Sequence, residues 1–467
     1  MKSKKRNWLK LSLQGGTLLA IVAFILYGIF FGEQRADPEA YCPFGGLQAI
    51  GSYLHNNSLA CSMSMAQIMM GVVLAVGVIL FSKLFCGYLC PLGTIGEYLG
   101  KGGRKLKMNF DLKPGGIADR GLRIVKYGLL FVVFYMSVSS SELFCKNFDP
   151  YYAMATGFKG EITAWMTSIS IVLLFLGSFF IKMFWCKYIC PLGALSNIFK
   201  FTITFVGLLL LFWLLGWAGL PSAWVWALGA ACLIGYLYEM IYLRSKVFPL
   251  LRIVRDAESC NGCGSCTKKC PYHIDLKELK TVRHIDCTLC GDCVSSCPKG
   301  SLQVGGKKSL RWLPGILTIV LFVLALILGN QWELPTIDER WGNTEQVGEM
   351  KTFEMEGLTS IKCYGSSKAF SAKMQKVPGV YGVKTFVKRH AVVISYDPAQ
   401  TNEDKIREVI FIPTIMKFSN PEPQVDSVEV LTLGVDKLFD RMDMVYFGNI
   451  LKQAPGIYGF DANIRAR

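Results

Sequence analysis

Two cysteine-rich segments in the second half of the chain constrain its fold more than any other feature. Each has the pattern C-x2-C-x2-C-x3-C-P, the first over residues 260–271 and the second over residues 287–298. Thiolates at these short spacings wrap around one inorganic core, and Gly262, Gly264 and Gly291 permit the tight bends that wrapping needs. The pattern predicts two [4Fe–4S] clusters. A zinc site or disulfide staples are the alternative, which two complete runs with matching prolines disfavour.

The segment around these runs, residues 251–305, resembles the bacterial-type twin-cluster ferredoxin domain. In that domain the fourth cysteine of each run ligates the cluster of the other run. We therefore expect one cluster to be bound by Cys260, Cys263, Cys266 and Cys297. We expect the other to be bound by Cys287, Cys290, Cys293 and Cys270. The resemblance implies that this segment carries electrons.

Much of the remaining chain is too apolar for an ordinary soluble protein, with 52% hydrophobic residues and a mean hydropathy of +0.36. A membrane-spanning helix needs about 20 mostly apolar residues. Seven segments qualify as candidate spans: 12–32, 65–85, 122–140, 162–184, 201–219, 223–243 and 312–329. We therefore expect a transmembrane helical domain over residues 1–250 and a last transmembrane helix within residues 306–330. We interpret the first span as an uncleaved anchor, because no small-residue cleavage site follows its long apolar stretch.

Basic residues predict how the chain is oriented. Lys2, Lys4, Lys5 and Arg6 precede the first span, so the positive-inside rule places the N-terminus in the cytoplasm. Seven spans then put the ferredoxin-like segment in the cytoplasm and everything after residue 330 outside. The formal net charge of +16 has no nucleic-acid recognition motif beside it and is better explained by this topology. We expect a multi-pass protein of the bacterial cytoplasmic (inner) membrane that binds no nucleic acid.

The membrane part contains an internal repeat, at about residues 12–100 and 122–200. Each half ends in a C-x3-C-P-L-G motif, at Cys86–Cys90 and at Cys186–Cys190. On a helix, an i, i+4 pair puts both sulfurs on one face, so the two pairs can supply four thiolates for a further iron–sulfur or iron centre. Buried packing cysteines, or pairs that cycle between thiol and disulfide, are the alternative.

Each half also carries a cysteine nearer its start, Cys42 in the first and Cys145 in the second. They are extra metal ligands, a redox-active pair on the outer face, or structural residues. The predicted topology separates them from the C-x3-C pairs across the membrane. Glu239 is the acidic residue to note in the candidate spans; because it is near a span end, we expect it to snorkel towards the membrane surface.

These motifs, over about residues 12–305, resemble the membrane domain of the polyferredoxins associated with periplasmic nitrate reductase and nitrous oxide reductase. The resemblance implies electron transfer between a cytoplasmic donor or quinol and an acceptor at the outer face, through redox partners in a larger membrane complex. It favours an electron-transfer subunit over a stand-alone oxidoreductase. No haem-attachment motif, nicotinamide-binding glycine motif or histidine within a span is present, so haem and NAD are not expected.

After the last span, residues 331–420 resemble the heavy-metal-associated domain of copper chaperones, which implies an α+β fold of βαββαβ order. In that family a C-x-x-C pair binds Cu(I), but Ser360 takes the first position here and leaves Cys363 alone. A copper role for Cys363 and a metal-free docking domain remain alternatives. Residues 421–467 suggest a second, cysteine-free copy.

The fold class predicted from the sequence is thus a polytopic α-helical membrane protein with an inserted twin [4Fe–4S] ferredoxin domain and a C-terminal α+β domain. Two functions compete with electron transfer. One is a copper-handling cupric reductase or chaperone-like accessory protein. The other is a non-catalytic assembly subunit of a membrane redox complex.

Overall fold

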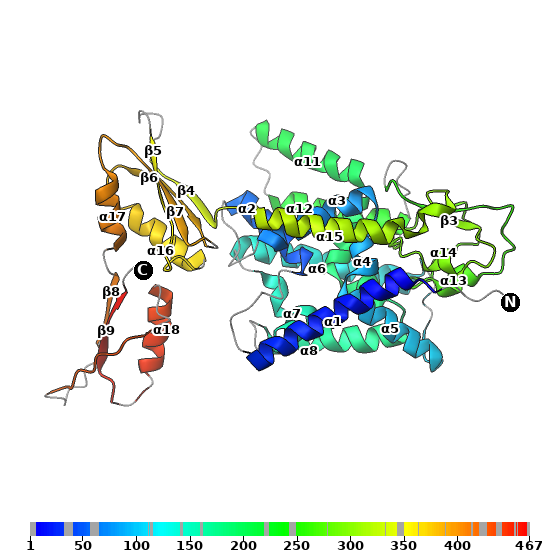
Figure 1. The fold of residues 1–467 in the computed structure, drawn as a ribbon, viewed down its shortest axis with the longest axis horizontal. Coiled ribbons are helices and arrows are strands. Elements are labelled where there is room, and N and C mark those ends of the chain that lie inside the picture. The colour runs from blue at the N-terminus through cyan, green and yellow to red at the C-terminus, as the bar shows by residue number, and fades with distance from the viewer. Residues whose placement is uncertain are drawn as a thin grey trace. The chain divides into compact units, whose positions relative to one another are not determined.

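The computed structural model describes most of the chain, and Figure 1 traces its helices and strands. The described residues are 6–31, 41–56, 65–110, 112, 115–140, 143–158, 162–218, 224–241, 249–277, 279–331, 333–342, 350–362, 364–387, 389–411, 414–419, 427–435, 441–452, 454 and 456–464. The chain divides into two compact units, Met1–Gln48 with Ala66–Gln331 and Ala49–Met65 with Trp332–Arg467, which are described separately below.

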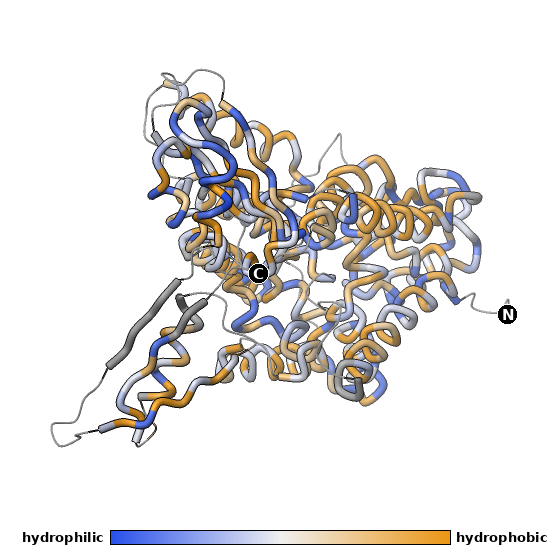
Figure 2. Tube along the Cα trace, turned by 60° about the vertical axis from the view of Figure 1, so that its left-hand side comes forward, coloured by the Kyte–Doolittle hydropathy of each residue, from blue (hydrophilic) through white to orange (hydrophobic). Residues whose placement is uncertain are grey.

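Helices make up most of the first unit. In chain order they are α1 (Trp8–Phe31), α2 (Pro43–Asn56), which begins in this unit, α3 (Met65–Leu80), α4 (Leu84–Tyr88), α5 (Pro91–Lys105), α6 (Ile117–Ser140), η2 (Phe144–Asn147), α7 (Pro150–Ala155), α8 (Ala164–Val172), η3 (Leu173–Gly177), α9 (Ser178–Phe180), η4 (Trp185–Ile189), α10 (Pro191–Lys200), α11 (Thr202–Trp217), α12 (Trp224–Ile241), η5 (Lys308–Trp312) and α15 (Leu313–Gln331). Figure 2 shows hydrophobic residues along most of their length. Large apolar side chains such as Leu19, Leu210 and Ile316 are at least half exposed, which suits helices whose outer faces contact lipid.

Four helices are long and apolar enough to cross a membrane: Trp8–Tyr27, Ile117–Ser139, Trp224–Ile241 and Leu310–Gln331. A fifth span results if α10 and α11, which meet at 91°, are counted together. The helix α3 has 16 residues and rises only about 24 Å, short of a hydrocarbon core of about 30 Å. Ala164–Phe180 is also short and contains the π-helical turn η3. Each of the seven apolar segments contains helix, but among the described residues only four or five meet the length and composition expected of a span, fewer than the seven predicted.

The ferredoxin-like segment folds as a small module within the first unit. Its elements are β1 (Ile253–Arg255), α13 (Ser265–Lys269), β2 (Thr281–Val282), α14 (Asp292–Ser296) and β3 (Leu302–Val304). The strands form an antiparallel sheet of order β2-β1-β3. Ile253, Ile274 and Leu302 of the module share a buried core with Leu84 and Tyr88 of α4. The module is therefore packed directly onto the helices, and Figure 1 shows it at one end of α15.

The second unit is a mixed α/β region, as the sequence predicts. Its elements are β4 (Ile337–Arg340), β5 (Lys351–Met355), α16 (Tyr364–Met374), β6 (Val380–Phe386), β7 (Ala391–Tyr396), α17 (Glu403–Phe411), β8 (Thr414–Ser419), α18 (Arg441–Lys452) and β9 (Gly459–Ile464). The order from β5 to β8 is the expected βαββαβ. However, β8 pairs with β9, and β4 supplies the fourth strand of the main sheet, whose order is β4-β6-β7-β5. The Trp341 indole, which donates to the Val380 carbonyl at 2.7 Å, holds β4 at that edge.

Candidate metal centres

Each cysteine run of the module forms a loop that leads into a short helix. The first loop leads into α13 and the second into α14, and in both cases the residue before the helix is a glycine with left-handed backbone. These are Gly264, with φ of 66°, and Gly291, with φ of 76°. A side chain at Gly264 would also lie 2.7 Å from the Lys277 side chain. The glycines therefore permit the sharp turn that wraps each loop around a central space.

Two separate cavities divide the eight cysteines of the module into groups of four. The first cavity is lined by Cys260, Cys263, Cys266 and Cys297. The second is lined by Cys270, Cys287, Cys290 and Cys293. In each group, three cysteines come from one run and the fourth from the other run. This is the grouping expected when two runs exchange their last ligands.

The donor set fits iron–sulfur clusters better than single metal ions. Within the described part of the chain, no three His, Cys, Asp or Glu side chains converge as ligands of one ion would. The four thiolates of a [4Fe–4S] cluster bind four different irons, so they surround a cavity and do not meet at one point. Four cysteines around a cavity, twice in one module, is the arrangement that such clusters require.

The thiols of the two cavities differ in their electrostatic surroundings. The backbone N–H of Gly262 and the guanidinium of Arg255 stabilise the thiolate of Cys260 and lower its pKa. In the second cavity, burial raises the pKa of Cys270 to about 11. Because a bound metal deprotonates a coordinating thiol, metal binding at Cys270 would release a proton.

The two C-x3-C motifs of the membrane domain have the same local structure. The structure places Cys86 in α4, Cys90 at the N-cap of α5, Cys186 in η4 and Cys190 at the N-cap of α10. Pro91 and Pro191 begin the helices α5 and α10, and a residue before proline is disfavoured in helical conformation. Both capping cysteines are accordingly extended. Each pair therefore lies on either side of a helix break, and the prediction of two sulfurs on one helix face is wrong.

Gly93 and Gly193 keep these breaks compact. A Cβ atom at Gly93 would lie 2.8 Å from the Cys86 carbonyl oxygen, and one at Gly193 would lie 2.9 Å from the Cys186 carbonyl oxygen. The Gly93 N–H also points to the Cys90 sulfur at 3.4 Å. The glycine of the C-P-L-G motif is thus needed because the chain packs against itself beside each cysteine pair.

One cavity of the membrane domain is lined by six cysteines together with Tyr41, Lys83 and Asp149. The six are Cys42, Cys86, Cys90, Cys145, Cys186 and Cys190. The space free of atoms, including the opening, is about 840 Å³, compared with about 380 and 350 Å³ for the ferredoxin cavities. There is thus room for a group at least as large as in the module.

This cavity corrects the sequence-based topology. Cys42 directly precedes α2, and Cys145 lies in η2, just before the N-cap of α7. Both segments fold back among the helices and bring their cysteines to the C-x3-C pairs. The prediction that Cys42 and Cys145 lie apart from those pairs is therefore wrong. The alternation of spans and loops could not have revealed this, because it treats every loop as lying outside the helices.

Tyr272 forms a wall between the six-cysteine cavity and the second ferredoxin cavity. It lines both cavities and hydrogen-bonds to Cys186. It follows Cys270 by two residues. The segment that contributes Cys270 to the second ferredoxin cavity therefore also lines the six-cysteine cavity. The two sets of cysteines are separated here by a single aromatic side chain.

A buried ionic network that the sequence did not reveal joins α1 to the second cysteine run. Lys10 donates to Glu97 of α5 at 2.7 Å and to Asp292 at 2.6 Å, and the neighbouring Asn7 donates to the Cys290 carbonyl at 2.7 Å. Burial alone would raise the pKa of Glu97, but Lys10 and Lys101 lower it to about 2. The second cysteine loop is therefore held against the helices by charge as well as by packing.

A second buried network centres on Arg123 of α6. Its guanidinium contacts Asp119 at 3.2 Å, Asp286 of the module at 2.9 Å, and Glu239 of α12. Lys126 donates to Glu239 at 2.7 Å. Glu239 is fully buried, so the prediction that it snorkels to the surface is wrong. A signal was available in the sequence: Arg123 and Lys126 lie at helical spacing in another candidate span, where unpaired charges are costly.

The other predicted ligand, Cys363, lies outside the described residues. Its neighbourhood in the second unit is the start of α16, where the Lys362 N–H donates to the Ser366 hydroxyl at 2.9 Å. The loop is thus fixed at this point by a polar side chain of the helix.

Comparison with known protein families supports iron–sulfur binding in both parts of the first unit. Residues 63–109 and 163–203 match a 4Fe-4S binding domain, and residues 252–298 match a 4Fe-4S dicluster domain. The first match contains both C-x3-C motifs, and the second contains both ferredoxin runs completely. No solved structure matches the chain.

Several known proteins are similar over the same region. The putative electron transport protein YccM of Escherichia coli is 30% identical over 257 residues, which are 54% of this chain and 58% of YccM. The regulatory protein NosR of Stutzerimonas stutzeri is 34% identical over 26% of this chain and 17% of NosR. The ferredoxin-type protein NapH of Haemophilus influenzae is 31% identical over 25% of this chain and 38% of NapH. The chain thus spans less than two thirds of each of these relatives. Together with the apolar helices, the matches make it a multi-pass membrane protein with 4Fe–4S binding domains.

Proposed function

We propose that this chain, whose 4Fe–4S domains are NapH- and NosR-like, conducts electrons between a cytoplasmic donor or quinol and an acceptor at the outer face of the membrane. The relative YccM is named as a putative electron transport protein, which supports this class of function. Bound at the cysteines described above, iron–sulfur clusters would supply one-electron redox chemistry. The chain's own residues would hold these groups and set their surroundings.

The observation that carries this proposal is the position of Tyr272. One side chain separates the six-cysteine cavity from the second ferredoxin cavity. Cys263 of the first ferredoxin cavity is exposed, whereas Cys293 of the second is buried. The three cavities therefore form a series that begins at the surface of the module and ends among the helices. A series of closely spaced redox sites is what electron transfer through a membrane domain requires.

We assign ligands as follows. The first cluster would be held by Cys260, Cys263, Cys266 and Cys297, and the second by Cys270, Cys287, Cys290 and Cys293. A further centre would use Cys86, Cys90, Cys186 and Cys190, with Cys42 and Cys145 as additional ligands from the same cavity. The six cysteines Cys42, Cys86, Cys90, Cys145, Cys186 and Cys190 face one space, which favours a metal centre over packing residues.

Iron and acid-labile sulfide per chain test this assignment. In protein purified without oxygen, more than about eight irons per chain are expected, and about eight would mean that only the module is loaded. Cys86→Ser with Cys186→Ser should lower iron to about eight and leave the electron paramagnetic resonance (EPR) signals of the module in place. Cys232→Ser is the matched control, because Cys232 is buried in α12 and does not line the cavity. A folded chain without iron would end the proposal.

Orientation and the C-terminal unit need their own tests. We propose that the ferredoxin module faces the cytoplasm and that residues after 330 lie outside. A membrane-impermeant alkylating reagent added to intact cells should then label Cys363, and protection of Cys363 until the cells are opened would reverse the orientation.

We further propose that residues 331–420 form a heavy-metal-associated-like domain, with residues 421–467 as a second copy. The element order β5-α16-β6-β7-α17-β8 supports the likeness. A single thiolate is a weak Cu(I) site, so we favour docking of a redox partner. Equal Cu(I) uptake by the intact chain and by Cys363→Ala is expected, and a clear loss in the variant would favour copper handling.

A further inference from the structure

Two buried lysines of the first unit lack an acidic partner. The side chains of Lys83 and Lys200 are almost completely buried. Lys83 donates to the Gly193 carbonyl at 3.3 Å, and Lys200 donates to the carbonyls of Ile285 and Cys287 at 2.7 and 2.8 Å. No carboxylate of the described residues is within ion-pair distance of either ammonium group. Asp286 attracts Lys200 only from a greater distance, because it is already paired with Arg123.

The other buried lysines of this unit, Lys10 and Lys126, form ion pairs with acidic side chains. Lys10 is paired with Glu97 and Asp292, and Lys126 is paired with Glu239. A buried ammonium group without a counter-charge is costly, so proteins pair it or place it beside an ion. Carbonyl oxygens satisfy the N–H groups of Lys83 and Lys200 but do not neutralise their charge. The missing negative charge has to come from something else that binds nearby.

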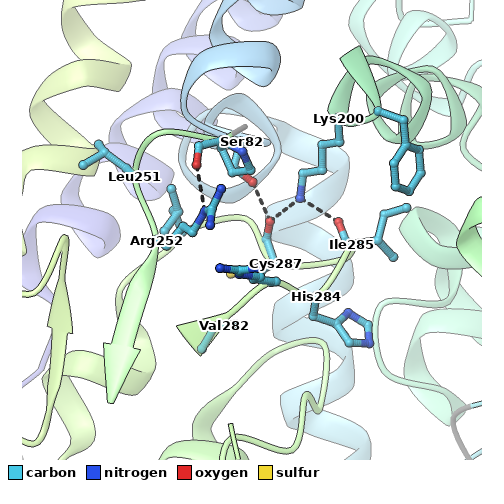
Figure 3. Close-up of a pocket in the computed structure, with 12 residues that line it drawn as sticks. Ser82, Lys200, Leu251, Arg252, Val282, His284, Ile285 and Cys287 are labelled. Atoms are coloured by element: carbon cyan, nitrogen blue, oxygen red, sulfur yellow. Dashed lines mark hydrogen bonds between the residues drawn. The ribbon is translucent and has the colours of Figure 1, made fainter. Parts of the chain in front are cut away.

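The positions of Lys83 and Lys200 indicate the source of this negative charge. Lys83 lines the six-cysteine cavity. Figure 3 shows Lys200 with its ammonium group between the carbonyls of Ile285 and Cys287, and Ser82 donates to the same Cys287 oxygen at 2.8 Å. Both ammonium groups are within electrostatic range of Cys86 in one site and Cys287 in the other. The two lysines therefore lie between the six-cysteine cavity and the second ferredoxin cavity. In both cavities, cysteine thiolates would bind metal.

We infer that Lys83 and Lys200 are the buried counter-charges of the anionic iron–sulfur groups in these two sites and that they raise the reduction potentials there. This inference rests on the proposed function. A cluster held by four thiolates is negatively charged and becomes more so on reduction, so a fixed positive charge close by favours the reduced form. The two lysines are positioning residues, because they touch the backbone and thiol surroundings of the sites and not a reacting atom.

Neutral variants of similar length test the inference. Lys83→Met and Lys200→Met remove the charge and keep most of the packing volume. A redox titration followed by EPR should show the affected centre at least tenfold harder to reduce, which is about 59 mV for a one-electron couple. Lys83→Met should act mainly on the six-cysteine site, which Lys83 lines, and Lys200→Met should act mainly on the site of Cys287, whose carbonyl Lys200 contacts. The first ferredoxin site, which neither lysine lines, is the internal control. Lys105→Met, which removes an exposed charge, should leave all potentials unchanged.

The outcomes separate this inference from the proposed function. Absence of iron in the wild-type chain would remove the proposed function and the inference with it. Iron at wild-type level together with unchanged potentials in both methionine variants would overturn the inference alone. If a methionine variant loses iron, Lys83→Arg and Lys200→Arg decide. Restored iron and a wild-type potential support the counter-charge role, whereas restored iron with a potential still shifted tenfold or more overturns it.

Discussion

Replacing Arg123 with methionine should destabilise the folded chain more than most other single substitutions in the membrane domain, apart from those that remove a cysteine. The guanidinium and its three acidic partners are at most 3% exposed. After the replacement, Glu239 keeps Lys126 and Tyr127, and Asp119 keeps Tyr188. Asp286 is left with His284, whose Nδ1 is 3.9 Å away.

The loss of unfolding free energy can be estimated from the carboxylate of Asp286, which loses its ion-pair partner. Breaking a buried ion pair by removing one partner costs about 3–5 kcal/mol. At about 2 °C per kcal/mol for a large domain, the midpoint of thermal unfolding should fall by about 6 °C or more. Because Asp286 directly precedes Cys287, we expect the second cysteine run to detach from α6 in the Arg123→Met variant.

Unfolding of the detergent-solubilised chain, followed with a thiol-reactive dye, measures this effect. Lys101→Met is the matched control: Lys101 is 43% exposed, and its partner Glu97 keeps Lys10, so a change of about 1 kcal/mol or less is expected. Arg123→Met combined with Asp286→Asn should recover part of the loss, because no unpaired carboxylate remains. An unfolding midpoint within 1 °C of wild type for Arg123→Met, or an equal shift in the control, would refute the reasoning.

Four further results are expected. Gly93→Ala should lower the iron of the six-cysteine site and spare the module, because the new Cβ would lie 2.8 Å from the Cys86 carbonyl; Gly128→Ala, with open space around it, should leave iron and unfolding midpoint unchanged or raise the midpoint. Lys10→Met should cost about 3 kcal/mol of unfolding free energy in the same dye assay, since the partly buried Asp292 loses its ion-pair partner and the buried Glu97 is left with the exposed Lys101. Tyr272→Leu should slow electron transfer from the module to the membrane site in freeze-quench EPR while Tyr272→Phe keeps most of it; equal rates in both would exclude Tyr272 from the route. Chelation of iron should lower the unfolding midpoint of the wild-type chain, because ligands that bind only the folded state stabilise it.

The sequence predicts the local features of this protein well. The cysteine spacing, together with the resemblance to twin-cluster ferredoxins, divides the eight module cysteines into the same two groups that line two cavities. Apolar runs locate the helices. The fold class follows from these two signals together with the change of composition after residue 330.

What the sequence could not predict depends on contacts between distant segments. Arg123 meets Asp286 across 163 positions, and Lys10 meets Asp292 across 282 positions, so no local pattern links them. The re-entry of the segments around Cys42 and Cys145 is likewise set by packing among helices and not by hydropathy. The same holds for β8, which pairs with β9 and not with the main sheet.

The two halves of the ferredoxin module are unequally protected, since one lies against the helices and the other includes the exposed Cys263. Oxygen and peroxide reach an exposed sulfur first, so oxidative damage should begin at the first cysteine group and spare the second for longer. Under the proposed function, the chain would lose its outermost redox site in air while the buried sites stay intact.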